Sequence, residues 1–171
     1  ELSRMHEQCR ALVMVPAGLR EQWIDELRRR LGLTATLADS AWIRTARSER
    51  PVQVNPWSLP GIYVTSHDLV KRPEVLRPLE DVTWDIVVVD EAHVVTSRSD
   101  RRTAVHAIAA RSRRVVLLSA TPNSGDRLEF EALCDIGSLP SDRSPVVLFE
   151  RSRTAVGEHR SRRTRILSVA C

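Results

Sequence analysis

Several common features are missing from this 171-residue sequence. It has one lysine, Lys71, among 26 basic residues, and no glycine-rich loop ending in Lys-Ser or Lys-Thr, the loop that cradles nucleotide phosphates in many ATPases. No apolar run reaches the roughly eighteen residues that a membrane span needs, and no charged-then-apolar leader is visible. We therefore expect no membrane association and a cytoplasmic location.

Cysteine is also scarce. Cys9, Cys134 and Cys171 are widely spaced and odd in number, so they form neither a CxxC metal pair nor a disulfide framework. We expect inert thiols in a reducing cytosol. The net charge of +4 comes almost wholly from arginine, which is compatible with nucleic-acid binding but also with a compositional bias of the coding sequence.

Apolar runs alternate with helical patterns along the chain, which is typical of a parallel sheet flanked by helices. The first run is Ala11–Val15, and Leu19, Trp23 and Leu27 then recur at helical spacing until Gly32. Trp23 is expected to be a core residue of that helix. Further strands are predicted at 34–38, 62–65, 85–89 and 115–118, a loop at 44–61, and helices at 99–110 and 126–136, the last burying Leu128, Phe130 and Leu133.

Two of these strands end abruptly in polar residues. Ile86–Val89 is followed by Asp90 and Glu91, and Val115–Leu118 is followed by Ser119. A carboxylate pair at the tip of a buried strand is costly unless it is used. Asp90 is a candidate Mg²⁺ ligand acting through water, and Glu91 a candidate base for the water that attacks a γ-phosphate. The alternative is that both only cap a following helix.

A family resemblance rests on several segments that occur in the family's order along the chain. Asp90-Glu91-Ala92-His93 resembles the second helicase motif, and Ser119-Ala120-Thr121-Pro122 the third, of superfamily-two helicase-like ATPases. The segments 15–23 (VPAGLREQW) and 63–69 (YVTSHDL) are similar to those of Swi/Snf-type members, especially their bacterial branch, as is 117–126 (LLSATPNSGD). The family has a DEAH-like box at this position.

The resemblance implies an α/β fold of the RecA-like, P-loop NTPase type, a parallel sheet flanked by helices and incomplete at its N-terminus. It implies ATP and Mg²⁺ as cofactors and a motor that translocates along or remodels duplex DNA. In such a motor, His93, Ser119 and Thr121 would couple the nucleotide state to motion. The candidate contacts to the DNA backbone, which carry no sequence specificity, are Arg20, Gln22, Thr65 and Ser66. For Arg20 and Gln22 the alternative is ordinary solvation of a helix surface.

The resemblance divides the chain into two parts. Residues 1–145 correspond to a partial RecA-like lobe, and residues 146–171 to an Arg-rich extension toward a second lobe in the same full-length chain. Because the phosphate loop and the second lobe's arginines are absent, we expect residues 1–171 alone to be inactive as an ATPase. Glu150 departs from the consecutive arginines of bacterial members.

Two other functions stay open. The chain could be a catalytically dead, stand-alone lobe that binds DNA or a protein, or part of a DEAH-type RNA helicase, which the Gln22-Trp23 segment disfavours. The resemblance also implies that the strand before the phosphate loop pairs beside 115–118. Without it, Val115–Leu118 is an open apolar edge, so we expect poor solubility or marginal stability.

Overall fold

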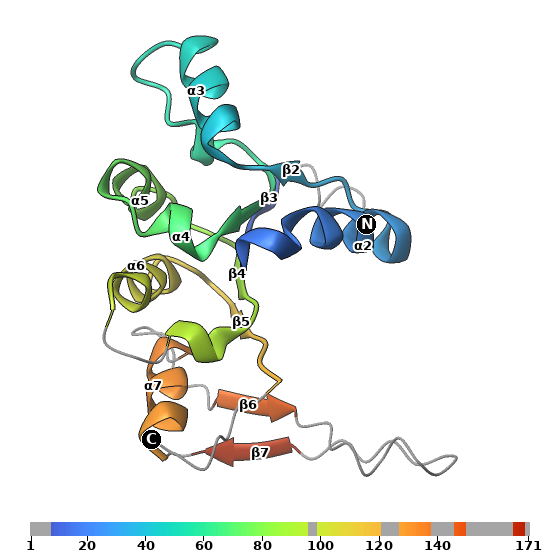
Figure 1. Ribbon diagram of the computed structural model, residues 1–171, viewed down its shortest axis with the longest axis vertical. Helices are drawn as coiled ribbons and strands as arrows, with labels where there is room; N and C mark the ends of the chain where they lie inside the picture. Colours follow the sequence, from blue (N-terminus) through green and yellow to red (C-terminus); the bar gives the residue numbers. More distant parts are fainter. Residues whose placement is uncertain (1–7, 96–98, 121–126, 138–145, 150–165, 170–171) are drawn as a thin grey trace. The chain divides into compact units, whose positions relative to one another are not determined.

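The computed structural model describes residues 8–95, 99–120, 127–137, 146–149 and 166–169. The chain divides into two compact units, Glu1–Leu139 and Pro140–Cys171. In the second unit, strand β6 (Val146–Phe149) pairs antiparallel with β7 (Ile166–Val169). The candidate site residues that the structure describes belong to the first unit, which Figure 1 colours from blue to orange.

The first unit is built on a five-stranded parallel sheet in the order β2-β3-β1-β4-β5. The predicted parallel sheet flanked by helices is therefore confirmed. The runs expected from the sequence form its strands: β1 (Arg10–Val15), β2 (Thr36–Leu37), β3 (Gly61–Ser66), β4 (Ile86–Val89) and β5 (Val115–Leu117).

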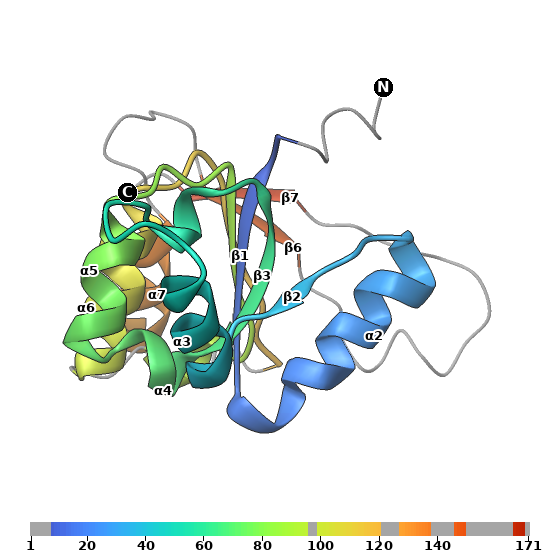
Figure 2. The same cartoon turned by 90° about the horizontal axis from the view of Figure 1, so that it is seen from above.

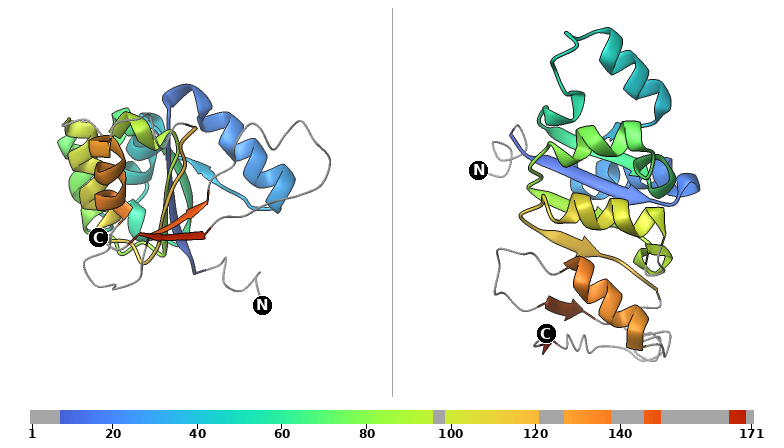
Figure 3. Two further views of the ribbon diagram at one scale, coloured as in Figure 1. Left: turned by 90° about the horizontal axis from the view of Figure 1, so that it is seen from below. Right: turned by 90° about the vertical axis from the view of Figure 1, so that its left-hand side faces the viewer.

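Helices cover the two faces of this sheet unequally (Figure 2). Helix α2 lies on one face, and α4 to α7 lie on the other, with α5 and α6 side by side (Figure 3). The helical elements are η1 (Ala17–Leu19), α2 (Arg20–Leu31), α3 (Ser40–Ser48), η2 (Pro56–Ser58), α4 (His67–Val70), α5 (Pro73–Glu80), η3 (Ala92–Val95), α6 (Asp100–Ala109) and α7 (Arg127–Gly137).

Successive side chains of β1 pack into two different parts of the core, one on each face of the sheet. Leu12 and Met14 pack into the large cluster under α3 to α7, whereas Val13 and Val15 pack against α2. Successive strand side chains point to opposite faces, so a strand buried on both sides reads as a continuous apolar run. This burial explains why the apolar runs predicted the strands correctly.

The strand order reverses between β1 and β4. These strands are neighbours in the sheet, yet the chain leaves β1 toward α2 on one face and leaves β4 toward α6 on the other (Figure 2). In open parallel sheets, ligands bind outside the carboxyl ends of the strands at such a switch point. Pro16 follows β1 and Asp90 follows β4 at this edge.

Two predicted details are wrong. Residues 44–48, expected in a loop, continue α3, because Ile43 and Ala46 are buried at helical spacing and the Asp39 side chain caps the helix through the Trp42 N–H. Leu128, expected on the buried face of α7, is 73% exposed, since burial on that helix begins about a turn later, at Ala132. The sequence also indicates a linker at residues 137–145; Gly137 is the last residue of α7, and residues 138–145 lie outside the described residues.

The remainder of the 44–61 segment is held by aromatic packing. Trp57 is fully buried, and its ring centroid lies 4.8 Å from that of Trp42 and 5.6 Å from that of Tyr63. Aromatic pairs in this range prefer tilted and edge-to-face geometry, as here. These tryptophans therefore anchor an irregular segment to the core and leave no exposed stacking platform.

The edge of the sheet at β5 is partly uncovered. Val116 is 37% exposed and Leu118 is 38% exposed, both on the face that carries α2 further along the sheet. As expected from the sequence, β5 is the last strand of the described sheet. None of the described helices has the length and apolar character that a membrane crossing requires.

Candidate functional site

The acidic pair lies at the end of β4, fixed by the strands on both sides. The Asp90 N–H donates to the Met14 carbonyl of β1 at 2.8 Å, and the Ala92 N–H donates to the Leu118 carbonyl at 2.8 Å. Backbone hydrogen bonds to two neighbouring strands therefore hold the turn that carries Asp90 and Glu91. The prediction that these carboxylates reach the carboxyl edge of the sheet is confirmed in its geometry; their catalytic roles stay predictions.

Both oxygens of the Asp90 carboxylate accept hydrogen bonds. Trp23 Nε1–H of α2 donates to Oδ2 at 2.7 Å, and the Glu91 N–H donates to Oδ1 at 2.9 Å. Trp23 is half-buried among Leu19, Ile24 and Val13, so its predicted core role is confirmed. Its contact with the acidic site, 67 residues away in sequence, was not predicted.

Glu91 has a backbone conformation that is rare for a residue with a side chain. Its φ is +49°, and it is the one non-glycine residue with positive φ among those described. Such strain persists only where the surrounding structure imposes it, and it gathers at functional sites. The carboxylate Oε2 lies 3.2 Å from Nδ1 of His93, and both side chains are more than one-third exposed. The turn thus presents Glu91 at the surface of the edge.

His93 and Ser119 meet beside the acidic pair, as predicted. Ser119 Oγ lies 3.5 Å from His93 Nδ1, so the ends of β4 and β5 are linked through the same imidazole nitrogen that faces Glu91. Thr121, the third residue predicted for coupling, lies outside the described residues. This chain of contacts is what a coupling role needs, and the role itself stays a prediction.

The donor set fits a hydrated Mg²⁺ ion better than a directly enclosed metal. Each Asp90 oxygen accepts one protein hydrogen bond and keeps a further lone pair, which suits Mg²⁺ held through its own waters. Within the described part of the chain, no group of three or more His, Cys, Asp or Glu side chains could hold a metal by itself.

Lys71, the lysine of this sequence, lies in a surface ion-pair network rather than beside the acidic pair. Asp68 pairs with Lys71 at 2.9 Å and with Arg101 at 2.7 Å. These partners lower the pKa of Asp68 below its usual range.

The four predicted DNA contacts fall into two groups. Gln22 is exposed on the first turn of α2, and Arg20 Nε donates to the Ala17 carbonyl at 2.8 Å, which leaves the rest of its guanidinium available at the start of that helix. Thr65 and Ser66 are buried, and Ser66 Oγ accepts the Leu69 N–H as the cap of α4. Their hydroxyls do not face solvent, so a phosphate contact there would involve the backbone.

Two buried polar atoms next to the site have no hydrogen-bond partner among the described residues, Thr65 Oγ1 and His67 Nε2. The Met14 carbonyl, which accepts the Asp90 N–H, also lies beside the His67 ring and favours its protonated form. Burial lowers the pKa of His67, although the Met14 carbonyl opposes this. The neutral imidazole is therefore the favoured form in the folded protein.

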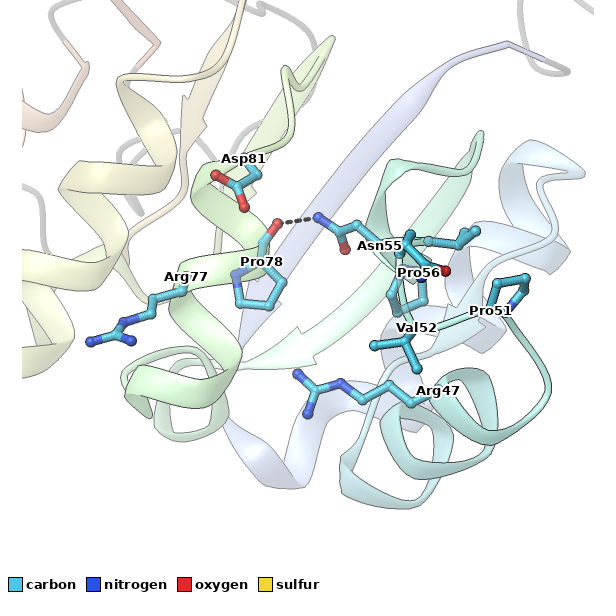
Figure 4. Close-up of a pocket in the computed structure, with 10 residues that line it drawn as sticks. Arg47, Pro51, Val52, Asn55, Pro56, Arg77, Pro78 and Asp81 are labelled. Atoms are coloured by element: carbon cyan, nitrogen blue, oxygen red, sulfur yellow. Dashed lines mark hydrogen bonds between the residues drawn. The ribbon is translucent and has the colours of Figure 1, made fainter.

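A separate hollow of about 550 Å³ lies between the segment after α3 and helix α5 (Figure 4). Asn55 Nδ2 donates to the Pro78 carbonyl at 2.6 Å across it, and Arg47 and Arg77 lie at its rim with Asp81. Prolines and valines make up much of its wall, and its charges are of mixed sign. It does not include the acidic pair.

The fold and the edge define the class. A parallel sheet with a switch point, a strand that ends in a carboxylate pair and a neighbouring strand that ends in a serine beside a histidine are the features of a RecA-like ATPase lobe. The SNF2-related domain matches residues 1–146. The chain belongs to this family of helicase-like ATPases and is an N-terminal RecA-like lobe of the Swi/Snf type, as the sequence predicted.

Relatives and solved structures agree with this assignment. The chain is 36% identical over 118 residues to the RNA polymerase-associated protein RapA of Cronobacter sakazakii, covering 66% of the chain and 12% of that protein. It is 32% identical over 130 residues to RapA of Serratia proteamaculans, covering 72% of the chain and 13% of that protein. The chain therefore spans about an eighth of these relatives.

Two solved structures share the fold. The SWI2/SNF2 ATPase core of Sulfolobus solfataricus, solved in complex with double-stranded DNA, has a TM-score of 0.61 and 18% identity over 80% of this chain and 26% of its own. The Hef helicase domain of Pyrococcus furiosus has a TM-score of 0.54 and 19% identity over 78% of this chain and 28% of its own.

Proposed function

We propose that this chain is the first lobe of a DNA-dependent ATPase that uses ATP to move on or remodel duplex DNA. The observation that carries the proposal is the fixed acidic turn at the switch point, with Asp90 held from both sides and Glu91 beside His93 and Ser119. The Swi/Snf core of Sulfolobus solfataricus, which has the same fold, was solved on double-stranded DNA, and this supports DNA as the partner.

In this proposal each residue has a distinct task. Asp90 holds hydrated Mg²⁺, which when bound offsets the charge of the nucleotide phosphates. Glu91 accepts a proton from the attacking water, and its exposed carboxylate is free to face a ligand at the sheet edge. His93 and Ser119 report the state of that carboxylate to β5. Arg20 and Gln22 at the start of α2 contact phosphates of the DNA backbone without reading its sequence.

These 171 residues contain only part of an ATPase site. No phosphate loop of the Gly-x-x-x-x-Gly-Lys-Ser/Thr kind occurs in them, and we propose that a longer chain supplies this loop together with a second RecA-like lobe. The short coverage of the relatives supports a longer chain. The same missing loop supports one other candidate, a catalytically dead lobe that binds DNA or a protein.

Rates of ATP hydrolysis by the full-length native protein, with and without double-stranded DNA, test the first proposal. We expect DNA to raise the rate and Glu91→Gln to abolish it. Glu49→Gln, an exposed change beyond the end of α3, is the matched control and should leave the rate unchanged. A native protein of 19.3 kDa without ATPase activity, measured as intact mass in its source cell, would favour the dead lobe.

A further inference from the structure

We infer that Trp23 is a positioning residue for Asp90, and that through it the placement of the metal-binding carboxylate depends on the seating of α2. This inference rests on the proposed function. Its physical basis is the indole N–H that donates to Asp90 Oδ2 at 2.7 Å, which is short for a hydrogen bond from nitrogen and has the length of a charge-assisted one.

The bond is the second of two contacts that orient the Asp90 carboxylate about its side-chain torsions χ1 and χ2. The backbone of Asp90 is held by the Met14 carbonyl, and Oδ1 by the N–H of the adjacent Glu91. Both contacts are local to the turn or the sheet. The indole supplies the contact that comes from another layer of the fold, so it determines how the carboxylate plane faces the sheet edge.

The position of the indole is in turn set by helix α2. The ring packs with Leu19 and Ile24 on the sheet face formed by Val13 and Val15, so a shift of the helix carries the ring with it. Arg20 and Gln22, the candidate phosphate contacts, lie one turn or less before Trp23 on the same helix. If a DNA phosphate binds at the start of α2 and shifts the helix, the indole of Trp23 shifts with it and changes the orientation of the Asp90 carboxylate. DNA binding and metal binding are then coupled through this one side chain.

A different reading is that Trp23 contributes apolar packing alone and the N–H merely finds a partner, as buried indoles usually do. Two substitutions separate these readings. Trp23→Phe keeps an aromatic ring of useful size but has no donor. Trp23→His keeps an N–H at the place of the indole nitrogen, since imidazole matches the five-membered half of indole, but it loses the larger ring. Trp42→Phe, in the aromatic cluster of α3, is the matched control.

The variants are compared in the full-length protein by two measurements. The first is the gain in affinity for a fluorescent ATP analogue when Mg²⁺ is added, which needs no turnover. The second is the ratio of ATPase rates with and without duplex DNA. Loss of a partner that orients a metal ligand typically costs about 10- to 100-fold in metal affinity or activity. We expect a loss of about 10-fold in the Mg²⁺-dependent gain for Trp23→Phe, a smaller loss for Trp23→His, and none for Trp42→Phe.

The DNA-stimulation ratio should fall in the same order, and Trp23→Phe should have no added effect in an Asp90→Asn background. The inference is overturned if Trp23→His is worse than Trp23→Phe in both measurements, or if Trp23→Phe matches Trp42→Phe. Failure of the proposed function is distinguishable, because it would appear in the wild-type protein as an absence of Mg²⁺-dependent nucleotide binding or of stimulation by DNA. Should Trp23→Phe lower the melting temperature steeply, Trp23→His is compared with the wild type instead: a loss well below 10-fold in the Mg²⁺-dependent gain supports the inference, and a loss of about 10-fold or more overturns it.

Discussion

Because the backbone at Glu91 is left-handed, we predict that glycine is more stable than alanine at this position, the reverse of the usual order. At ordinary positions, replacement by glycine is less stable than replacement by alanine, because glycine loses more backbone freedom on folding. That loss is about 0.5–1 kcal/mol. Glu91 has a φ of +49°, where a Cβ costs roughly 1–2 kcal/mol. Glycine removes this cost, so Glu91→Gly should be more stable than Glu91→Ala by about 0.5–1 kcal/mol.

In the comparison of Glu91→Gly with Glu91→Ala, the contacts of the glutamate side chain are lost in both variants and cancel. Both variants lose the Glu91–His93 pair equally, and a pair that is more than one-third exposed contributes little. For a protein of this length, 1 kcal/mol moves the melting temperature by about 2–4 °C, so the glycine variant should melt about 1–4 °C above the alanine variant. Thermal unfolding followed by circular dichroism measures this difference.

Glu26, inside helix α2 and paired with Arg30, provides the matched control. There the order should be the usual one, with Glu26→Gly about 1 kcal/mol less stable than Glu26→Ala. If Glu91→Ala proves as stable as Glu91→Gly while the Glu26 pair behaves normally, the strain argument is refuted. Both Glu91 variants should also lack ATPase activity in the full-length protein, because neither has the carboxylate proposed to accept the proton of the attacking water.

Three further outcomes are expected. Thr65→Val should raise the melting temperature slightly, because it replaces a buried hydroxyl that has no partner among the described residues; a fall of several degrees would mean that the hydroxyl is bonded. Burial lowers the pKa of His67, so as the pH falls the unfolded chain takes up the imidazole proton before the folded chain does. The contribution of His67 to the free energy of unfolding should be fully present above the unfolded pKa of 6.5 and should decline as the pH falls below it. His67→Gln should reduce this pH dependence in urea titrations at several pH values. Val116→Lys should reduce self-association of residues 1–171 in light scattering, and an unchanged scattering signal with a soluble, sharply melting wild type would contradict the open-edge prediction.

The sequence was most informative for strands that are buried on both faces of the sheet. Strands β1, β3 and β4 are covered on one face and largely on the other, so each contains a continuous apolar stretch with a clear stop; β5 has the same pattern in the sequence, although Val116 is partly exposed. Helix α2 was predicted because Leu19, Trp23 and Leu27 recur on one face and Gly32 closes it with a φ of +65°. The polar residues that end β4 and β5 predicted the acidic edge for the same reason.

The sequence was least informative where neighbours in space are distant in the chain. Nothing in the pattern of α2 indicates that its tryptophan has an N–H directed at Asp90, because periodicity identifies a buried face but not the strand order beneath it. The strain at Glu91 carried no signal either, since the usual mark of a left-handed position is a glycine or asparagine. The short helix α3 was missed because only two of its residues are buried deeply enough to show a period.

The two edges of the five-stranded sheet are unlike. At one end β2 is only two residues long, a length that offers a neighbouring chain few unpaired backbone groups, whereas at the other end β5 carries the partly exposed Val116. A sheet that is open at both ends can add copies without limit and grow into a fibre. In the described sheet β5 is the more open edge, so pairing between copies of this unit would bring β5 against β5 about a two-fold axis and cover that edge in both copies. Association through this edge of the described sheet therefore favours pairs over fibres.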